Sequence, residues 1–138
     1  LKSERNDEEI THACVKTIAA FLNSEGGSLL IGIADDGGIV GIEVDKFNNV
    51  DKFQLHLLNV LKQSLGEAAT SELKIEIIPT GIESKNACLI ACKRSKTAVY
   101  SRVKGGGENF YVRTGPSTSQ LSARELVEYV RNNFPTSV

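Results

Sequence analysis

Two adjacent glycines, Gly26-Gly27, divide a helical pattern from a strand pattern near the start of the chain. Before them, Asn6 and Glu9 form a capping sequence, and the apolar residues that follow recur at the spacing of an amphipathic helix. Glycine closes a helix easily because it can take the left-handed backbone conformation. The apolar run at residues 28–34 is typical of a buried strand. We therefore expect a helix over residues 7–23 that stops at the glycines and leads directly into a strand.

Turn and cap residues predict the next two elements. Asp35-Asp36-Gly37-Gly38 is a tight turn in which Asp-Gly supplies the positive φ angles of a hairpin, so residues 39–44 should return as its second strand. Asp51 is an N-cap residue, and Gly66 is a helix stop. A helix over residues 51–65 is therefore expected after the first hairpin.

The second half of the chain contains strand patterns and one well-marked helix. The expected strands cover residues 72–79, 87–93, 98–100 and 110–113. The first two form a hairpin. Ser122 begins the sequence Ser-Ala-Arg-Glu, a capping box that predicts a final helix from there to residue 133.

The order of these elements shows no repeated strand-helix crossover, which favours an α+β fold. We expect a mixed, mostly antiparallel sheet of about six strands with three main helices packed on it. The chain has 138 residues and is 41% hydrophobic, which is the usual size and composition of one domain. Residues 1–138 are therefore expected to form a single domain.

Composition indicates where in the cell the protein is found and whether its cysteines bind a metal ion. No run approaches the roughly 18 apolar residues of a membrane span, and the charged start does not resemble a secretion signal, so we expect a cytoplasmic protein. The cysteines Cys14, Cys88 and Cys92 are an odd number, which indicates reduced thiols. Cys88 and Cys92 lie on one predicted strand about 13 Å apart, too far to share a metal ion. No metal or cofactor is expected.

The net charge of −1 conceals an asymmetry between the two halves. Residues 1–70 contain 6 Lys and Arg against 11 Asp and Glu, a sum of −5, whereas residues 71–138 contain 10 against 6, a sum of +4. A chain so close to neutral cannot bind nucleic acid through bulk charge. Such binding would require a local basic face.

A basic face is predicted at residues 93–113, where Glu108 is the only acidic residue. Alternation along the strand at residues 110–113 places Tyr111 and Arg113 on the same face. Arginine can bind phosphate with two hydrogen bonds, and tyrosine can stack on a base. The predicted interface consists of Lys93, Arg94, Lys96, Arg102, Lys104, Tyr111, Arg113, Ser117 and Thr118. The alternative interpretation is a solvated strand face with no ligand.

The Gly26-Gly27 turn has two interpretations that are compatible with each other. Backbone N–H groups in a turn without side chains can bind a phosphate group. The same glycines also end the preceding helix.

Residues 16–42, which contain Asn-Ser-Glu-Gly-Gly-Ser-Leu-Leu-Ile-Gly-Ile-Ala-Asp-Asp-Gly-Gly, closely resemble the central signature of the Schlafen AlbA family. Phe110-Tyr-Val-Arg-Thr-Gly-Pro-Ser-Thr118 is a second match, and the resemblance covers residues 7–133. It implies a DNA-binding domain of transcriptional regulators or helicase-related proteins, followed by a C-terminal effector domain. An older name for the family is a divergent ATPase domain. The chain has no G-x-x-x-x-G-K-[ST] motif, so ATP hydrolysis is not expected.

The resemblance also implies an alternative, because some animal Schlafen relatives are RNA nucleases with three catalytic carboxylates. The third of these aligns with Asp35, and carboxylates can hold the divalent metal ions that assist phosphodiester cleavage. The other two would precede residue 1, and Glu4 is a weak substitute for them. The plainer interpretation of Asp35 is a residue that opens the hairpin turn.

The leading hypothesis is a regulatory domain that binds DNA or RNA mainly through the phosphate backbone, with little sequence readout. A metal-dependent nuclease is one alternative. A protein-interaction or dimerisation module, acting as a homodimer that positions the C-terminal effector, is the other.

Overall fold

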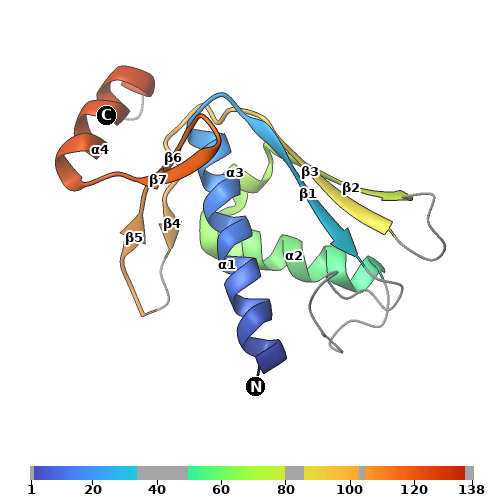
Figure 1. Cartoon of the computed structure of the whole chain (residues 1–138). Helices are drawn as coiled ribbons and strands as arrows, with labels where there is room; N and C mark the ends of the chain where they lie inside the picture. Colours follow the sequence, from blue (N-terminus) through green and yellow to red (C-terminus); the bar gives the residue numbers. More distant parts are fainter. Residues whose placement is uncertain (1, 34–49, 80–85, 103–104, 136–138) are drawn as a thin grey trace.

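The computed structural model describes residues 2–33, 50–79, 86–102 and 105–135 (Figure 1). The helices are α1 Lys2–Asn23, α2 Val50–Leu65, α3 Glu67–Thr70 and α4 Ala123–Asn133. The strands are β1 Gly27–Ile33, β2 Leu73–Pro79, β3 Asn86–Cys92, β4 Ser101–Arg102, β5 Glu108–Asn109, β6 Tyr111–Thr114 and β7 Ser117–Gln120. Each pair of neighbouring strands in these ranges is antiparallel. The expected α+β fold with antiparallel pairing is therefore confirmed.

The largest sheet has the strand order β1-β3-β2. β2 and β3 form the predicted second hairpin, with Ile75 opposite Ile90. β3 also pairs along its length with β1, where Leu30 lies opposite Leu89. The strand that was expected to pair with β1, at residues 39–44, lies outside the described residues together with its turn.

The other described strands form two small sheets, β4-β5 and β6-β7, instead of widening the first sheet to about six strands. The predicted strand at residues 98–100 does not form. The reason is that the N–H and C=O groups of Val99 each bond to the side chain of Asn23 at 2.8 Å, which leaves them unavailable to a neighbouring strand. β7 was not predicted, because its sequence Ser-Thr-Ser-Gln lacks an apolar alternation.

The helix starts differ from the predicted ones. α1 begins at Lys2, so Asn6 lies inside the helix and is not its cap. No glycine or proline precedes Asn6 to interrupt the helix. α2 begins at Val50, which places Asp51 in its first turn. Gly66 ends α2 as expected, with φ +92°, and the short α3 follows.

α1 and α2 cover the same face of the three-stranded sheet (Figure 1). The main core lies between these helices and the sheet, and both helices and all three strands contribute residues to it. Its fully buried side chains include Ile18, Leu22, Leu61, Cys88 and Ile90. No helix in the described ranges is long and apolar enough to cross a membrane.

The side chain of Asn23, at the end of α1, is completely buried. Its Nδ2 donates to the carbonyl oxygens of Val99, at 2.8 Å, and Tyr111, at 2.9 Å. Its Oδ1 accepts from the N–H of Val99 at 2.8 Å. The backbone carbonyl of Asn23 accepts from the Tyr129 hydroxyl at 2.5 Å. One residue therefore connects α1 to the segment before β4, to β6 and to α4.

The neighbours of Asn23 extend this connection. The N–H of Ser95 donates to the carbonyl of Leu22 at 2.8 Å, and the N–H of Arg113 donates to Oγ of Ser24 at 2.9 Å. The bond to Leu22 satisfies a carbonyl in the last turn of α1, where backbone carbonyls have no partner within the helix. The bond to Ser24 ties β6 to the residue that follows α1.

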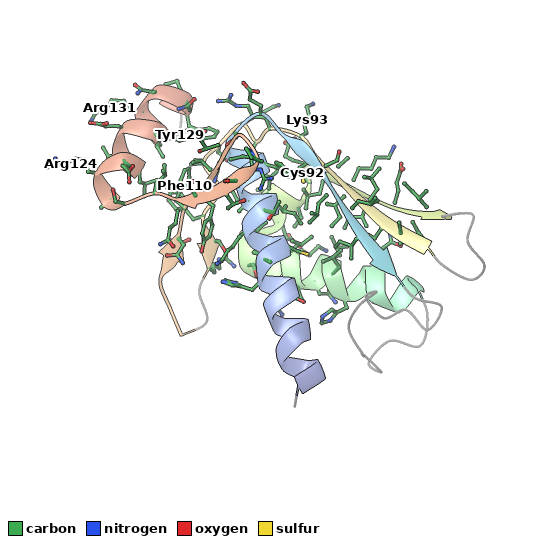
Figure 2. All side chains as sticks on the ribbon, in the orientation of Figure 1. Cys92, Lys93, Phe110, Arg124, Tyr129 and Arg131 are labelled. Atoms are coloured by element: carbon green, nitrogen blue, oxygen red, sulfur yellow. The ribbon has the colours of Figure 1, made fainter. Side chains whose placement is uncertain are left out.

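A second, smaller core holds α4 against β6. It consists of Phe110, Val112, Val130 and Phe134, with Ala98, Tyr100, Leu121, Leu126 and Tyr129 packed around them. Figure 2 shows Phe110 and Tyr129 between α4 and the strands. The predicted capping box is confirmed, because Oγ of Ser122 accepts from the N–H of Glu125 and the Glu125 carboxylate accepts from the N–H of Ser122.

All three cysteines are free and buried, in agreement with the expected structural thiols. Burial raises the pKa of each thiol, to about 11 for Cys88 and about 12 for Cys92. Cys14 adds to the shift at Cys88. The thiols therefore stay protonated in the folded protein at neutral pH.

Replacement of Asn23 by alanine should lower the free energy of unfolding by about 2–4 kcal/mol, because it leaves buried backbone groups without partners at about 1–3 kcal/mol each. Urea unfolding followed by circular dichroism measures this change. Asn59→Ala is the matched control, since Asn59 is exposed on α2 and should change stability by less than about 0.5 kcal/mol. Equal losses in both variants would contradict the role of Asn23.

The buried thiols predict a loss of stability at alkaline pH. From the usual value of 9.0 up to the raised pKa of about 12 at Cys92, the unfolded thiol ionises and the folded one does not. The stability that a protonated buried thiol contributes is fully present below pH 9.0. It falls as the pH rises toward the folded pKa of about 12, by up to about 1.4 kcal/mol per pH unit for each thiol. Urea unfolding across this range should show a shallower pH dependence for Cys92→Ala than for the unchanged chain. An identical slope would rule out the thiol as its cause.

Candidate functional site

The Arg113 side chain leaves β6 and is held in one orientation. Its Nη1 donates to Oγ1 of Thr118 at 2.9 Å, and its Nη2 donates to the carbonyl of Pro116 at 2.8 Å. The guanidinium carbon lies 5.2 Å from the centre of the Phe21 ring, which is within cation–π distance. A hydroxyl, a backbone carbonyl and an aromatic ring together fix this half-buried cation.

Arg94 follows β3 and reaches the end of α4. Its Nη2 donates to the carbonyl of Asn133 at 3.2 Å, and the guanidinium lies 5.5 Å from the centre of the Phe134 ring. A cation at this place also complements the negative end of the helix dipole. Arg94 therefore contributes to the docking of α4 as well as to the surface.

Both arginines line one open cleft of about 540 Å³ between the ends of α1 and α4. The other lining residues are Phe21, Ser24, Glu25, Gly26, Gly115, Tyr129 and Asn133. Within the described part of the chain, neither guanidinium makes an ion pair with a carboxylate. Each retains N–H donors, because a guanidinium has more of them than these bonds use.

The charged side chains that line the cleft are Arg94 and Arg113, with two positive charges, and Glu25, with one negative charge. The carbonyl ends of α1 and α4, each equivalent to about half a negative charge, offset the remaining positive charge. Lys93 and Lys96, which are exposed near Arg94 along the chain but do not line the cleft, add positive charge beside it. The cleft is suited to an anionic group that accepts hydrogen bonds from planar guanidinium donors.

Gly26 lines the cleft, but its backbone N–H is not free for a phosphate. The N–H donates to the carbonyl of Phe21 at 2.9 Å, which corrects the predicted phosphate contact at this residue. A Cβ on Gly26 would lie 2.6 Å from the carbonyl oxygen of Cys92, and one on Gly27 would lie 2.6 Å from the Phe21 ring. The two glycines therefore end α1 and let the chain pass close to Phe21 and β3.

Tyr111 does not lie on the expected exposed face. The predicted alternation is present, since Phe110 and Val112 belong to the smaller core and Tyr111 faces the other way. That other side is the main core, however, and only 4% of Tyr111 is exposed. Its ring is unavailable for stacking on a base. Lys16 lies 5.8 Å from it and covers part of it.

The remaining predicted residues are distributed over several surfaces. Arg102 donates from Nη1 to the carbonyl of Gln63 at 3.3 Å, near the end of α2 and apart from the cleft. Lys93 lines a hollow beside the ends of β1, β2 and β3. Ser117 is exposed on β7, next to Thr118, the partner of Arg113. Lys104 and Asp35 lie outside the described residues.

Sequence reasoning did not predict Ser24, Tyr129 or Asn133 as site residues. Each lies at or near a helix end, and only the packing of α4 beside the end of α1 brings them together. Within the described ranges, no group of three or more His, Cys, Asp or Glu residues is placed to hold a metal ion.

Comparison with known proteins gives one family and one solved structure. The model of the family described as Schlafen, AlbA_2 matches residues 1–122. The crystal structure of the DIP2311 protein from Corynebacterium diphtheriae has a similar fold, with a TM-score of 0.53 and 17% sequence identity. The similarity covers 91% of this chain and 22% of that one. At this identity the likeness extends to the fold alone.

Gly26→Ala should destabilise the chain strongly, because the new methyl group would overlap the Cys92 carbonyl and the backbone has φ +80°. Gly115→Ala is the matched control. Gly115 also lines the cleft and has φ +59°, but a Cβ there meets nothing within 4 Å. We expect Gly115→Ala to cost about 1–2 kcal/mol and Gly26→Ala clearly more. Thermal unfolding of the two variants tests this, and equal melting temperatures would contradict it.

Proposed function

The chain belongs to the Schlafen AlbA_2 family, and from this premise we propose that it is a nucleic-acid-binding domain whose contacts go mainly to the phosphate backbone. The family suggests binding of nucleic acid, and the cleft between α1 and α4 is the proposed place of contact.

The single observation that carries this proposal is the pair of guanidinium groups in one cleft without carboxylate partners in the described residues. Arg113 and Arg94 are both oriented by hydrogen bonds and aromatic rings before any ligand arrives. Pre-oriented groups lose less conformational freedom on binding than mobile side chains do. A phosphate group accepts hydrogen bonds from such planar donors in pairs.

Exposed lysines extend the proposed surface beyond the cleft. Lys93 and Lys96 are exposed in the same segment as Arg94. Exposed cations of this kind interact with a charged backbone at any sequence. We therefore expect the affinity for nucleic acid to depend strongly on salt concentration and only weakly on nucleotide sequence.

We also propose that the domain belongs to a cytoplasmic transcriptional regulator or helicase-related protein. There it would bring a C-terminal effector domain to nucleic acid. A homodimer is one proposed form of assembly.

Arg113→Gln should weaken binding of a short nucleic acid at low salt about tenfold, because it removes charge-assisted hydrogen bonds to phosphate. It should also reduce the slope of log affinity against log salt concentration by about one. Fluorescence anisotropy at several salt concentrations measures both quantities. Arg94→Gln should act in the same direction.

Arg124→Gln is the matched control. It removes the same charge from an exposed site on α4, on the side away from Lys93 (Figure 2). It should leave affinity almost unchanged, and thermal unfolding should show that all three variants are folded. Binding that is as strong in Arg113→Gln as in Arg124→Gln would exclude the cleft as the contact surface.

A further inference from the structure

We infer that the preferred target of this surface is a double helix and not an extended single strand. This inference rests on the proposed function and adds the class of nucleic acid to it. It comes from the positions of the aromatic rings and of the two arginines.

All three tyrosines of the chain are engaged in packing. Tyr111 is 4% exposed in the main core. Tyr129 bonds through its hydroxyl to the carbonyl of Asn23, and its ring lies 5.8 Å from that of Phe110. Tyr100 is partly buried, with its ring 5.2 Å from that of Phe110.

The phenylalanines whose side chains the structure describes are engaged as well. Phe110 and Phe134 are each 2% exposed. Phe21 lies at the cleft, but its ring packs against the backbone of Gly27 and under the guanidinium of Arg113. Two aromatic side chains line the cleft among those that the structure describes. Phe21 orients Arg113, and Tyr129 is held by Asn23 and packs against Phe110 and Phe134, so neither ring is presented to a base.

Proteins that bind single strands combine a basic groove with exposed rings on which bases stack, and each stacked base strengthens binding by about fivefold or more. The described surface supplies the cations without such a stacking platform. A duplex needs no platform, because its bases are already stacked on one another. It also carries one negative charge per roughly 1.7 Å of its axis and releases more counterions per contact than a single strand does.

The fixed orientation of the two arginines favours the same target. Arg113 is held by Thr118, Pro116 and Phe21, and Arg94 is held by Asn133 and Phe134. Hydrogen-bond donors held in fixed positions suit the phosphates of a nucleic-acid duplex, because the double helix has already fixed where those phosphates lie. A single strand would have to be ordered on binding, and that ordering costs free energy.

The test compares a short duplex with each of its two separated strands, chosen without self-complementary sequence, in fluorescence anisotropy at low salt. Duplex RNA is measured beside duplex DNA, since both have the double-helical backbone. We expect the duplex to bind about tenfold or more tightly than either strand. Oligo-dA and oligo-dT should bind equally weakly, because backbone contacts do not depend on the base.

The outcomes separate this inference from the proposed function. Single strands that bind as tightly as the duplex, and lose affinity in Arg113→Gln, would retain the proposed function and overturn the duplex preference. A preference between oligo-dA and oligo-dT would overturn it too. If no nucleic acid binds, both fail together.

Tyr100→Leu provides a second check, because Tyr100 keeps part of its surface and lines a hollow with Arg102 that shares no residue with the cleft. We expect the ratio of duplex to single-strand affinity to stay unchanged in this variant. A selective loss of single-strand binding would show that Tyr100 is a stacking platform and would overturn the inference.

Discussion

The buried hydrogen bonds of Asn23 are the constraint on which the arrangement of the second half of the chain depends. Its side-chain amide forms hydrogen bonds with the backbone of Val99 and Tyr111, and its backbone carbonyl accepts a hydrogen bond from the Tyr129 hydroxyl. An amide in a core must have partners, because an unsatisfied one is costly. These partners come from segments 76 to 106 residues away along the chain. The end of α1 thus fixes where β6 and α4 lie relative to the main core.

The proposed binding cleft is built on the same helix end. Phe21 supports Arg113, Ser24 accepts its N–H, and Gly26 shapes the turn beside them. Arg94 joins from the other side because the end of α4 is held nearby. Stability and the geometry of the cleft are therefore coupled, and a change at the end of α1 affects both. For this reason the binding variants alter arginine tips and leave the glycines and Asn23 intact.

Local sequence signals were sufficient to predict most of the helices and strands in the described residues. The capping box at Ser122, the Gly66 stop and the β2-β3 hairpin are confirmed. The predicted strand at residues 98–100 was wrong, because strand propensity does not reveal that a distant asparagine takes the backbone partners of Val99. The candidate site was predicted only in part. Arg94 and Arg113 meet at the cleft, whereas Arg102 lies near the end of α2.

The sequence by itself determined which residues alternate, where the main helices end, where the last helix starts, and which segment is basic, because these properties depend on neighbours a few residues apart. It placed Tyr111 and Arg113 on the same side of β6, and that is confirmed. Only the tertiary structure decided what covers that side. The main core buries the tyrosine, and the arginine, two residues further on, reaches the cleft beside Phe21. Burial depends on the distant segments that pack against a strand, and strand periodicity carries no information about them.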